Sequence, residues 1–169
     1  AIQEIRRTCS VLIGMNVSAG TASRTWGDDK IHSLIGSILS RDASIGIVVL
    51  GTPTERRRFE PLAGQYQGRL VVPANGNSIQ DASAIIAEID FVITPDTAMV
   101  HIARSLGKPV VGLYTGNMSN RLKFQPWGEG NIIITSNHGS NIHGITVEQV
   151  TPAIDEMLQR FKRAKAATA

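Results

Sequence analysis

Cysteine is nearly absent from this sequence, since Cys9 is the only one in 169 residues. An intramolecular disulfide is therefore excluded, and a reducing compartment is expected. Long apolar runs are missing too: none approaches the roughly 18 to 20 residues that span a bilayer, and the opening residues lack the apolar core of a signal peptide. These absences predict a cytoplasmic protein whose aliphatic core is stable without disulfide bonds.

Aromatic residues are also scarce, at 5% of the chain. Surfaces that bind nucleic acid place stacking aromatics among basic residues, so we expect no nucleic-acid partner. The net charge is +3. Its basic excess falls into two clusters, Arg56, Arg57 and Arg58, then Arg160, Lys162, Arg163 and Lys165. A solvated helix face is the first interpretation of each cluster, with a phosphate-bearing ligand or weak attraction to an anionic membrane as alternatives.

Several common signatures of nucleotide and catalytic sites are missing as well. No G-x-G-x-x-G follows the first apolar run, and no G-x-x-x-x-G-K-[ST], G-x-S-x-G, H-E-x-x-H or C-x-x-C occurs anywhere. That run ends in Asn16 without an acidic pair, which argues against a receiver domain. Asp28 and Asp29 are neighbours at a helix start and point in different directions, so we expect no metal site.

Six short apolar runs are present, and they organise the chain. They are continuous and rich in β-branched residues, as strands buried on both faces of a parallel sheet are. The predicted strands are Val11–Asn16, Ile45–Leu50, Leu70–Val72, Phe91–Thr94, Val110–Tyr114 and Ile132–Thr135.

Amphipathic segments separate these runs and have recognisable starts. The predicted caps are Asp28 or Asp29, Thr54 for a helix over Glu55–Gln65, Ser78 with Asp81, Asp96 before Thr97–Leu106, and Thr146 with Gln149. Strands alternating with helices predict one three-layer α/β domain of Rossmann-like type, with a mostly parallel sheet of about six strands. We expect residues 166–169 to fray, and the start at Ala1 indicates that an upstream part is missing.

Ligands of such folds bind where the strands end, so the loops after the strands are the candidate site. These loops are rich in Gly, Ser, Thr and Asn: Val17–Trp26, Gly51–Glu55, Pro95–Met99 and Thr115–Arg121. With Arg24, Arg121 and Lys123 as cations, they suit a bound anion. The amides of Thr97, Ala98 and Met99 would start a helix and could hold a phosphate.

The turn from the predicted strand into the next helix, residues 94–101, is called the elbow, and two of its side chains have alternative interpretations. Asp96 suits a ligand-binding carboxylate or a simple N-cap. His101 lies one turn into the helix, where a single histidine is more often packed or capping than catalytic.

The elbow also carries a resemblance to a known family. The segments are Ala87–Ala103, Leu106–Tyr114, Pro126–Gly128, Ser18–Gly20 and Arg24–Trp26. The most specific piece is D-T-x-x-x-H-x-A, from Asp96 to Ala103, followed by L-G-K-P. Together they resemble the donor-binding half of family-nine, heptosyltransferase-type glycosyltransferases. The resemblance implies a two-domain GT-B enzyme, of which residues 1–169 are the C-terminal nucleotide-sugar-binding domain.

The resemblance also implies roles for individual residues. Asp96 would contact hydroxyls of the donor sugar, the amides of Thr97, Ala98 and Met99 would hold the diphosphate, and His101 belongs to the same motif. Ser18, Thr21 and Arg24 would line the phosphate side, and Glu55 would accept from the ribose hydroxyls. Two positions depart from the family: Arg24 stands where many relatives have Lys, and Ala98 stands where Gly is usual. Both departures bear on the donor sugar.

The implied function is inverting transfer of a sugar, most simply heptose from ADP-heptose to lipopolysaccharide core or a related envelope glycan. The catalytic base and the glycan or lipid-linked acceptor would belong to the missing N-terminal domain, so the chain alone should bind donor without turnover. No metal or other cofactor is implied, and peripheral contact with the inner face of the membrane is expected. The alternatives are an interaction module that keeps the fold without transferase activity, and half of another nucleotide-dependent enzyme such as a sugar-nucleotide epimerase.

Overall fold

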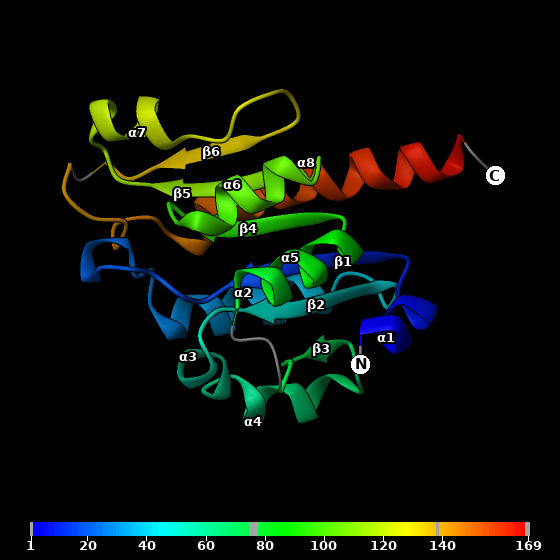
Figure 1. Ribbon diagram of the computed structural model, residues 1–169. Coiled ribbons are helices and arrows are strands. Elements are labelled where there is room, and N and C mark those ends of the chain that lie inside the picture. Colours follow the sequence, from blue (N-terminus) through cyan, green and yellow to red (C-terminus); the bar gives the residue numbers. More distant parts are fainter. Residues whose placement is uncertain (1, 75–77, 138, 168–169) are drawn as a thin grey trace.

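A six-stranded parallel sheet forms the centre of the protein (Figure 1). The computed structural model describes residues 2–74, 78–137 and 139–167. The strands lie in the order β3-β2-β1-β4-β5-β6, and their bounds are β1 (Val11–Asn16), β2 (Ile45–Leu50), β3 (Leu70–Val71), β4 (Phe91–Pro95), β5 (Val110–Tyr114) and β6 (Ile132–Thr135). The predicted Rossmann-like fold is confirmed, and the strand order reverses between β1 and β4.

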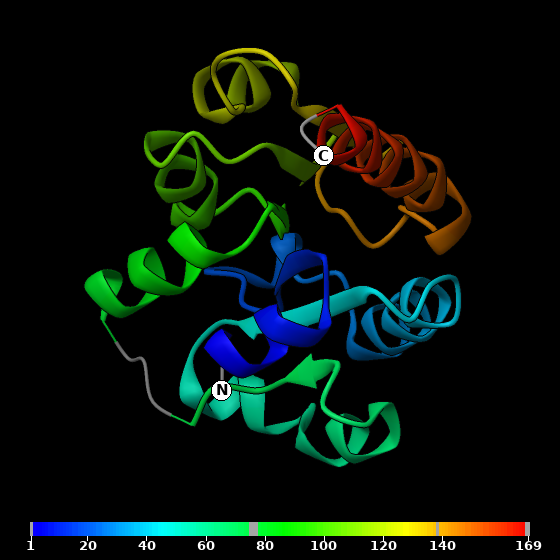
Figure 2. The same cartoon turned by 90° about the vertical axis from the view of Figure 1, so that its right-hand side faces the viewer.

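Helices cover both faces of the sheet (Figure 2). One face is packed by α1, α5 and α6, and the other by α2 and α8. The bounds are α1 (Ile2–Thr8), α2 (Asp28–Leu39), α3 (Pro53–Arg57), α4 (Glu60–Ala63), α5 (Ile79–Glu88), α6 (Ala98–Ser105), α7 (Met118–Phe124) and α8 (Val147–Ala166), with short 3₁₀ turns η1 (Ala22–Arg24) and η2 (Gly64–Tyr66). Within the described ranges no helix is long and apolar enough to cross a membrane.

The central strands β1 and β2 are buried along their whole length, as continuous apolar runs predict. Successive side chains enter opposite cores: Ile13 packs with α2 and α8, and Leu12 packs with α1 and α5. Gly46 permits the close approach of α1, because a Cβ at this position would lie 2.6 Å from Cδ1 of Ile5.

The segment after β2 differs from the predicted single helix over Glu55–Gln65. Its cap is Thr52, not Thr54: Thr52 and Glu55 form a capping box, with Pro53 in the first turn of α3. Pro61 then lies in the first turn of α4, where its missing N–H does no harm. Pro61 lies inside the predicted helix and cannot continue it, so the segment consists of α3, α4 and η2 in place of one helix.

The other predicted helix starts were partly right. Ser78 with Asp81 forms the predicted capping box of α5, and Thr146 exchanges hydrogen bonds with Gln149 ahead of α8. Asp28 is the first residue of α2, whose cap is Gly27 at a φ of 103°. Helix α8 ends at Ala166, the first residue of the tail that we expect to fray, and residues 168–169 of that tail lie outside the described residues.

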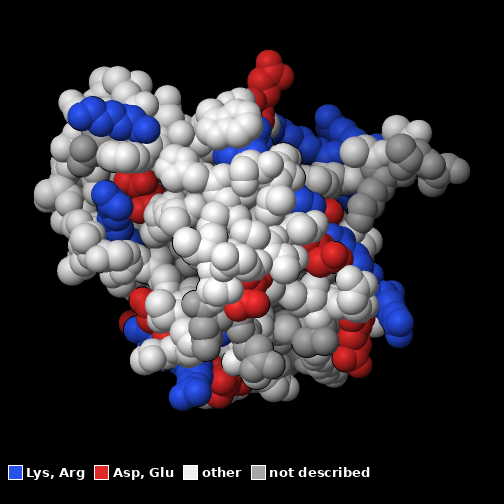
Figure 3. Space-filling model, viewed as in Figure 1, with Lys and Arg blue, Asp and Glu red and all other residues white. Residues whose placement is uncertain are grey.

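The two basic clusters differ, because Arg160, Lys162 and Arg163 are exposed on α8 as a solvated face predicts, whereas the first cluster is exposed only in part. Arg56 is only 2% exposed, which contradicts the exposed face predicted for its cluster. In the α8 cluster, Arg160 pairs with Glu156, and Lys162 pairs with Asp42 at 2.6 Å. Figure 3 shows basic and acidic side chains interspersed around a broad uncharged centre on the face in view.

Candidate functional site

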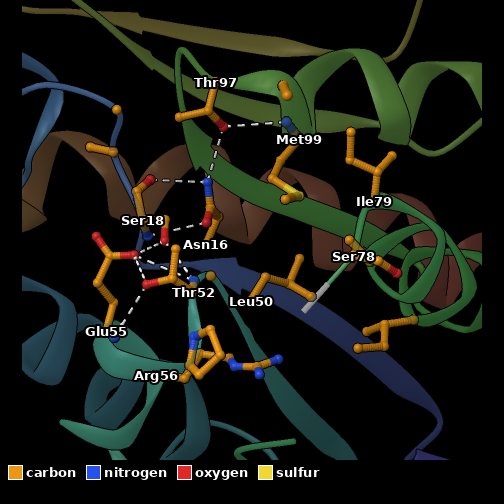
Figure 4. Close-up of a pocket in the computed structure, with 17 residues that line it drawn as sticks. Asn16, Ser18, Leu50, Thr52, Glu55, Arg56, Ser78, Ile79, Thr97 and Met99 are labelled. Atoms are coloured by element: carbon orange, nitrogen blue, oxygen red, sulfur yellow. Dashed lines mark hydrogen bonds between the residues drawn. The ribbon is translucent and has the colours of Figure 1, made fainter. Parts of the chain in front are cut away.

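A pocket of about 350 Å³, called the main pocket, opens at the carboxyl ends of β1 and β2 (Figure 4). It lies beside the point where the strand order reverses, the place where ligands of doubly wound folds bind. Its walls come from the loops after β1 and β2 and from the starts of α5 and α6. The lining residues are Asn16, Ser18, Ala19, Gly20, Leu50, Gly51, Thr52, Pro53, Glu55, Arg56, Ser78, Ile79, Ala82, Ile85, Thr97, Ala98 and Met99.

The main pocket has an apolar part and a polar part. Leu50, Ile79 and Met99 contribute apolar side chains, and Ile79 is 66% exposed on the mouth side. Ser18, Thr52 and Glu55 gather on the opposite side (Figure 4). An apolar slot beside a cluster of hydroxyl and carboxylate groups suits a flat ring attached to a hydroxylated sugar.

Glu55 is held by the loop that it faces. Its Oε2 accepts hydrogen bonds from the Ser18 hydroxyl, from the Thr52 hydroxyl at 2.5 Å and from the Thr52 amide at 3.3 Å. Burial raises the pKa of Glu55, but the hydrogen bonds from Ser18 and Thr52 outweigh it, so the pKa lies below its ordinary value. The carboxylate is therefore ionised at neutral pH and accepts hydrogen bonds.

Gly51 shapes the same loop. Its φ is +144°, and a Cβ there would lie 2.8 Å from the Ser18 hydroxyl. Only glycine fits this position without strain.

The start of α6 borders the main pocket. Thr97 is the cap, and its hydroxyl accepts from the Met99 amide at 3.3 Å. The prediction of three free amides is thus wrong for Met99. In the described part of the chain, the amides of Thr97 and Ala98 have no acceptor and lie at the positive end of the helix dipole. Asp96 is not the cap, because its side chain turns to a second hollow.

That hollow, the polar pocket, also measures about 350 Å³. It is lined by Thr21, Ser23, Arg24, Asp96, Thr115, Asn117, Gly139 and Ser140. Nη2 of Arg24 lies 3.4 Å from Oδ2 of Asp96, and Nη1 of Arg24 donates to the Asp96 carbonyl oxygen at 3.1 Å. Burial raises the pKa of Asp96, while the charges of Arg24 and His101 oppose the rise.

The loop that carries Arg24 is anchored by the chain ahead of α8. The indole of Trp26 is 4% exposed and donates to the Ile145 carbonyl oxygen at 2.8 Å. The Ile142 amide donates to the Ser23 carbonyl oxygen at 3.0 Å. These contacts fix the loop after β1 against the segment before α8, so Arg24 projects from a rigid base.

The predicted ligand residues divide between the two pockets. Ser18, Glu55, Thr97, Ala98 and Met99 line the main pocket, whereas Thr21, Arg24 and Asp96 line the polar pocket. His101 lines neither and is exposed on α6.

The lining residues that sequence reasoning did not place at the site include Asn16 and Arg56, whereas Thr115 and Asn117 lie in the loop Thr115–Arg121 that it proposed. Asn16 ends β1, and that position could have marked it. Arg56 sits in a run of three arginines, and nothing in the run distinguishes the buried one. Among the described residues, no group of three His, Cys, Asp or Glu side chains could hold a metal ion.

Comparisons with known proteins agree on one family. The sequence model of glycosyltransferase family 9 (heptosyltransferase) matches residues 9–151. The lipopolysaccharide core heptosyltransferase OpsX of Haemophilus influenzae is 35% identical over 54 residues, which are 32% of this chain and 15% of that protein.

Solved structures share the fold. The E. coli heptosyltransferase WaaC with ADP superposes with a TM-score of 0.71 at 20% identity, over 92% of this chain and 48% of WaaC. A second WaaC structure contains ADP-2-deoxy-2-fluoro heptose. The E. coli ADP-heptose lps heptosyltransferase II gives a TM-score of 0.72 at 16% identity, over 96% of this chain and 53% of that protein. The chain thus spans about half the length of these structures.

Proposed function

Because the chain belongs to glycosyltransferase family 9, we propose that it is the donor-binding domain of an inverting glycosyltransferase. The observation that carries the proposal is the place of the α6 start between the two pockets. Thr97 and Ala98 line the main pocket, and the adjacent Asp96 lines the polar pocket. A diphosphate lying across this start would receive backbone amides and the positive end of the helix dipole.

The main pocket would hold the nucleoside. Its apolar wall, with Leu50 and Ile79, offers a slot for the base. Glu55 lies across the pocket as an ionised acceptor for ribose hydroxyls. Adenine is the proposed base, because the structure of WaaC, a structural neighbour, contains ADP.

The polar pocket would hold the sugar. Asp96 offers a carboxylate to sugar hydroxyls, and Thr115 and Asn117 offer further polar groups. Arg24 would interact with the diphosphate from this side, in place of the Lys that is usual in the family. Heptose is the proposed sugar, because structural neighbours are described as acting on or containing ADP-heptose or its analogue.

Catalysis would require the second half of the enzyme. Inverting transfer needs a base that takes the proton of the acceptor hydroxyl as that oxygen attacks the anomeric carbon and the diphosphate leaves. The α6 amides and Arg24 would stabilise the departing diphosphate. We place the base and the acceptor, lipopolysaccharide core or a related glycan, on the other domain, with the reaction in the cytoplasm at the membrane surface. No metal cofactor is required in this proposal.

Calorimetric titration with ADP, UDP, GDP and ADP-heptose tests the proposal. ADP should bind more tightly than UDP or GDP. Asp96→Ala should weaken ADP-heptose about tenfold while leaving ADP within about threefold. Asp28→Ala is the control, because Asp28 pairs with Arg58 outside both pockets. If no nucleotide binds at millimolar concentration, even with a family N-terminal domain restored, the chain is an interaction module without transferase function.

A further inference from the structure

Asn16 is a buried polar side chain where an apolar one would be expected. It is the last residue of β1, beside Leu50 of β2, and only 2% of it is exposed. A buried amide without hydrogen bonds destabilises a fold, so its partners show what it does.

The side chain of Asn16 bonds to the loop after β1 and to the cap of α6 (Figure 4), and it also bonds to Thr94 of β4. Its Nδ2 donates two hydrogens among three acceptors, the Thr94 hydroxyl at 2.9 Å, the Thr97 hydroxyl at 3.1 Å and the Ser18 carbonyl oxygen at 3.2 Å, so one hydrogen is shared. Its Oδ1 accepts from the Ser18 amide at 3.1 Å. One amide group thus connects the end of β1, the loop after it and the cap of α6.

Each partner of Asn16 holds a further part of the main pocket. The Ser18 hydroxyl donates to Glu55 and accepts from the Thr52 amide at 2.9 Å. The Thr97 hydroxyl accepts from the Met99 amide and so fixes the first turn of α6. The loop after β1 and the α6 start therefore share a hydrogen-bonded support through Asn16, on the main-pocket side of the Arg24–Asp96 contacts.

We propose that Asn16 is a positioning residue, which fixes Ser18 and the α6 start relative to each other so that the two sides of the diphosphate site are set before the ligand binds. The proposal rests on the proposed function, since it needs a diphosphate between these segments. An amide suits the task because it donates to hydroxyl and carbonyl oxygens with one atom and accepts from an N–H with the other. A carboxylate at this position would have no hydrogen to donate to the Ser18 carbonyl.

The experiment compares ADP with adenosine, because only ADP carries the diphosphate. Asn16→Ala should weaken the binding of ADP at least about tenfold and leave that of adenosine within about twofold, since the hydrogen bonds of the Asn16 side chain go to Ser18, Thr94 and Thr97 and not to Glu55 or the apolar slot. Asn16→Asp places a negative charge beside the diphosphate, so it should weaken ADP more than Asn16→Ala does, with adenosine again little changed.

Thr94→Val is the matched control. It removes the Asn16 bond to Thr94 but leaves the bonds to Ser18 and Thr97. It should lower the urea midpoint and keep ADP affinity within about twofold of the unmodified chain. If Asn16→Ala does not fold, Asn16→Asp carries the test in its place, because it keeps the acceptor for the Ser18 amide and lacks the donor to Thr97.

Three outcomes would overturn the proposal. Unchanged ADP affinity in the folded variants would show that Asn16 only stabilises the fold. An equal loss of ADP and adenosine would show general damage to the pocket. If the unmodified chain binds no ADP, the proposed function fails and this inference fails with it, whereas ADP binding that is insensitive to Asn16 overturns the inference alone.

Discussion

The Arg24–Asp96 pair allows a prediction in which stability and binding change together. Asp96 is 8% exposed, and Arg24 reaches it through one ion pair at 3.4 Å and one hydrogen bond to its carbonyl oxygen at 3.1 Å. Arg24→Ala removes both interactions and leaves a largely buried carboxylate without its cation. Loss of a partner to a buried charged group destabilises by about 1 to 3 kcal/mol, and the partial exposure of Arg24 favours the lower half of that range.

The loss of stability in Arg24→Ala should be larger at neutral pH than at acidic pH. The pKa of Asp96 is raised above its ordinary 3.8 by burial, and Arg24 opposes the rise. Removing Arg24 should raise this pKa further. When folding raises the pKa of a carboxyl group, its protonated form stabilises the fold at low pH. This stabilisation is lost as the pH rises through the pKa of the group in the folded protein. The deficit of Arg24→Ala should therefore be full at pH 7 and shrink toward pH 4.

Urea unfolding at pH 7 and pH 4.5 measures both effects, and Arg58→Ala is the control. Arg58 pairs with Asp28 at 3.2 Å, and each side chain is more exposed than its counterpart in the Arg24–Asp96 pair. Its loss should lower the unfolding free energy by less than about 0.5 kcal/mol. ADP affinity should fall about tenfold or more for Arg24→Ala and stay unchanged for Arg58→Ala. An Arg24→Ala deficit that is equal at both pH values would refute the reasoning.

Two further predictions concern the supporting structure. Gly51→Ala should lower the unfolding free energy by about 1 to 3 kcal/mol, because alanine is strained at a φ of +144° and its Cβ would meet the Ser18 hydroxyl at 2.8 Å. An unchanged urea midpoint would contradict this. Asp42 has a pKa lowered to about 2 by hydrogen bonds from Lys162 and Ser44. Ionised Asp42 therefore stabilises the fold at a pH above its pKa in the unfolded chain, and this stabilisation is lost as the pH falls from about 4 toward 2. Thermal unfolding of Asp42→Asn should show a smaller loss of stability over that interval than the unmodified chain, and an identical acid profile would count against the pairing.

The sequence predicted the strands to within one residue at each end, because burial on both faces leaves a continuous apolar run in the sequence. Val72 falls outside β3 and Pro95 extends β4. Helix starts were less certain, since several residues can cap. Proline is favoured in the first turn of a helix, so Pro53 begins α3. The residue before it, Thr52, is then the cap in place of Thr54.

The candidate site was only partly predictable from the sequence. Loops after strands pointed to Ser18, Thr97 and Asp96, but their division between two pockets depends on which way each side chain turns. Arg56 was missed because its burial comes from elements distant in the sequence, and Asn16 because its hydrogen-bond partners Thr94 and Thr97 lie far along the chain. For His101, the motif marked a residue that the fold leaves on the surface.

Amide NMR of the labelled chain during titration with ADP and adenosine tests the central claim most directly. A donor site across the α6 start predicts that adenosine shifts resonances of the main pocket, such as Gly51 and Ile79. ADP should shift these and, in addition, the amides of Thr97 and Ala98. ADP shifts confined to the basic end of α8, or the absence of any difference between the two ligands at α6, would contradict the account.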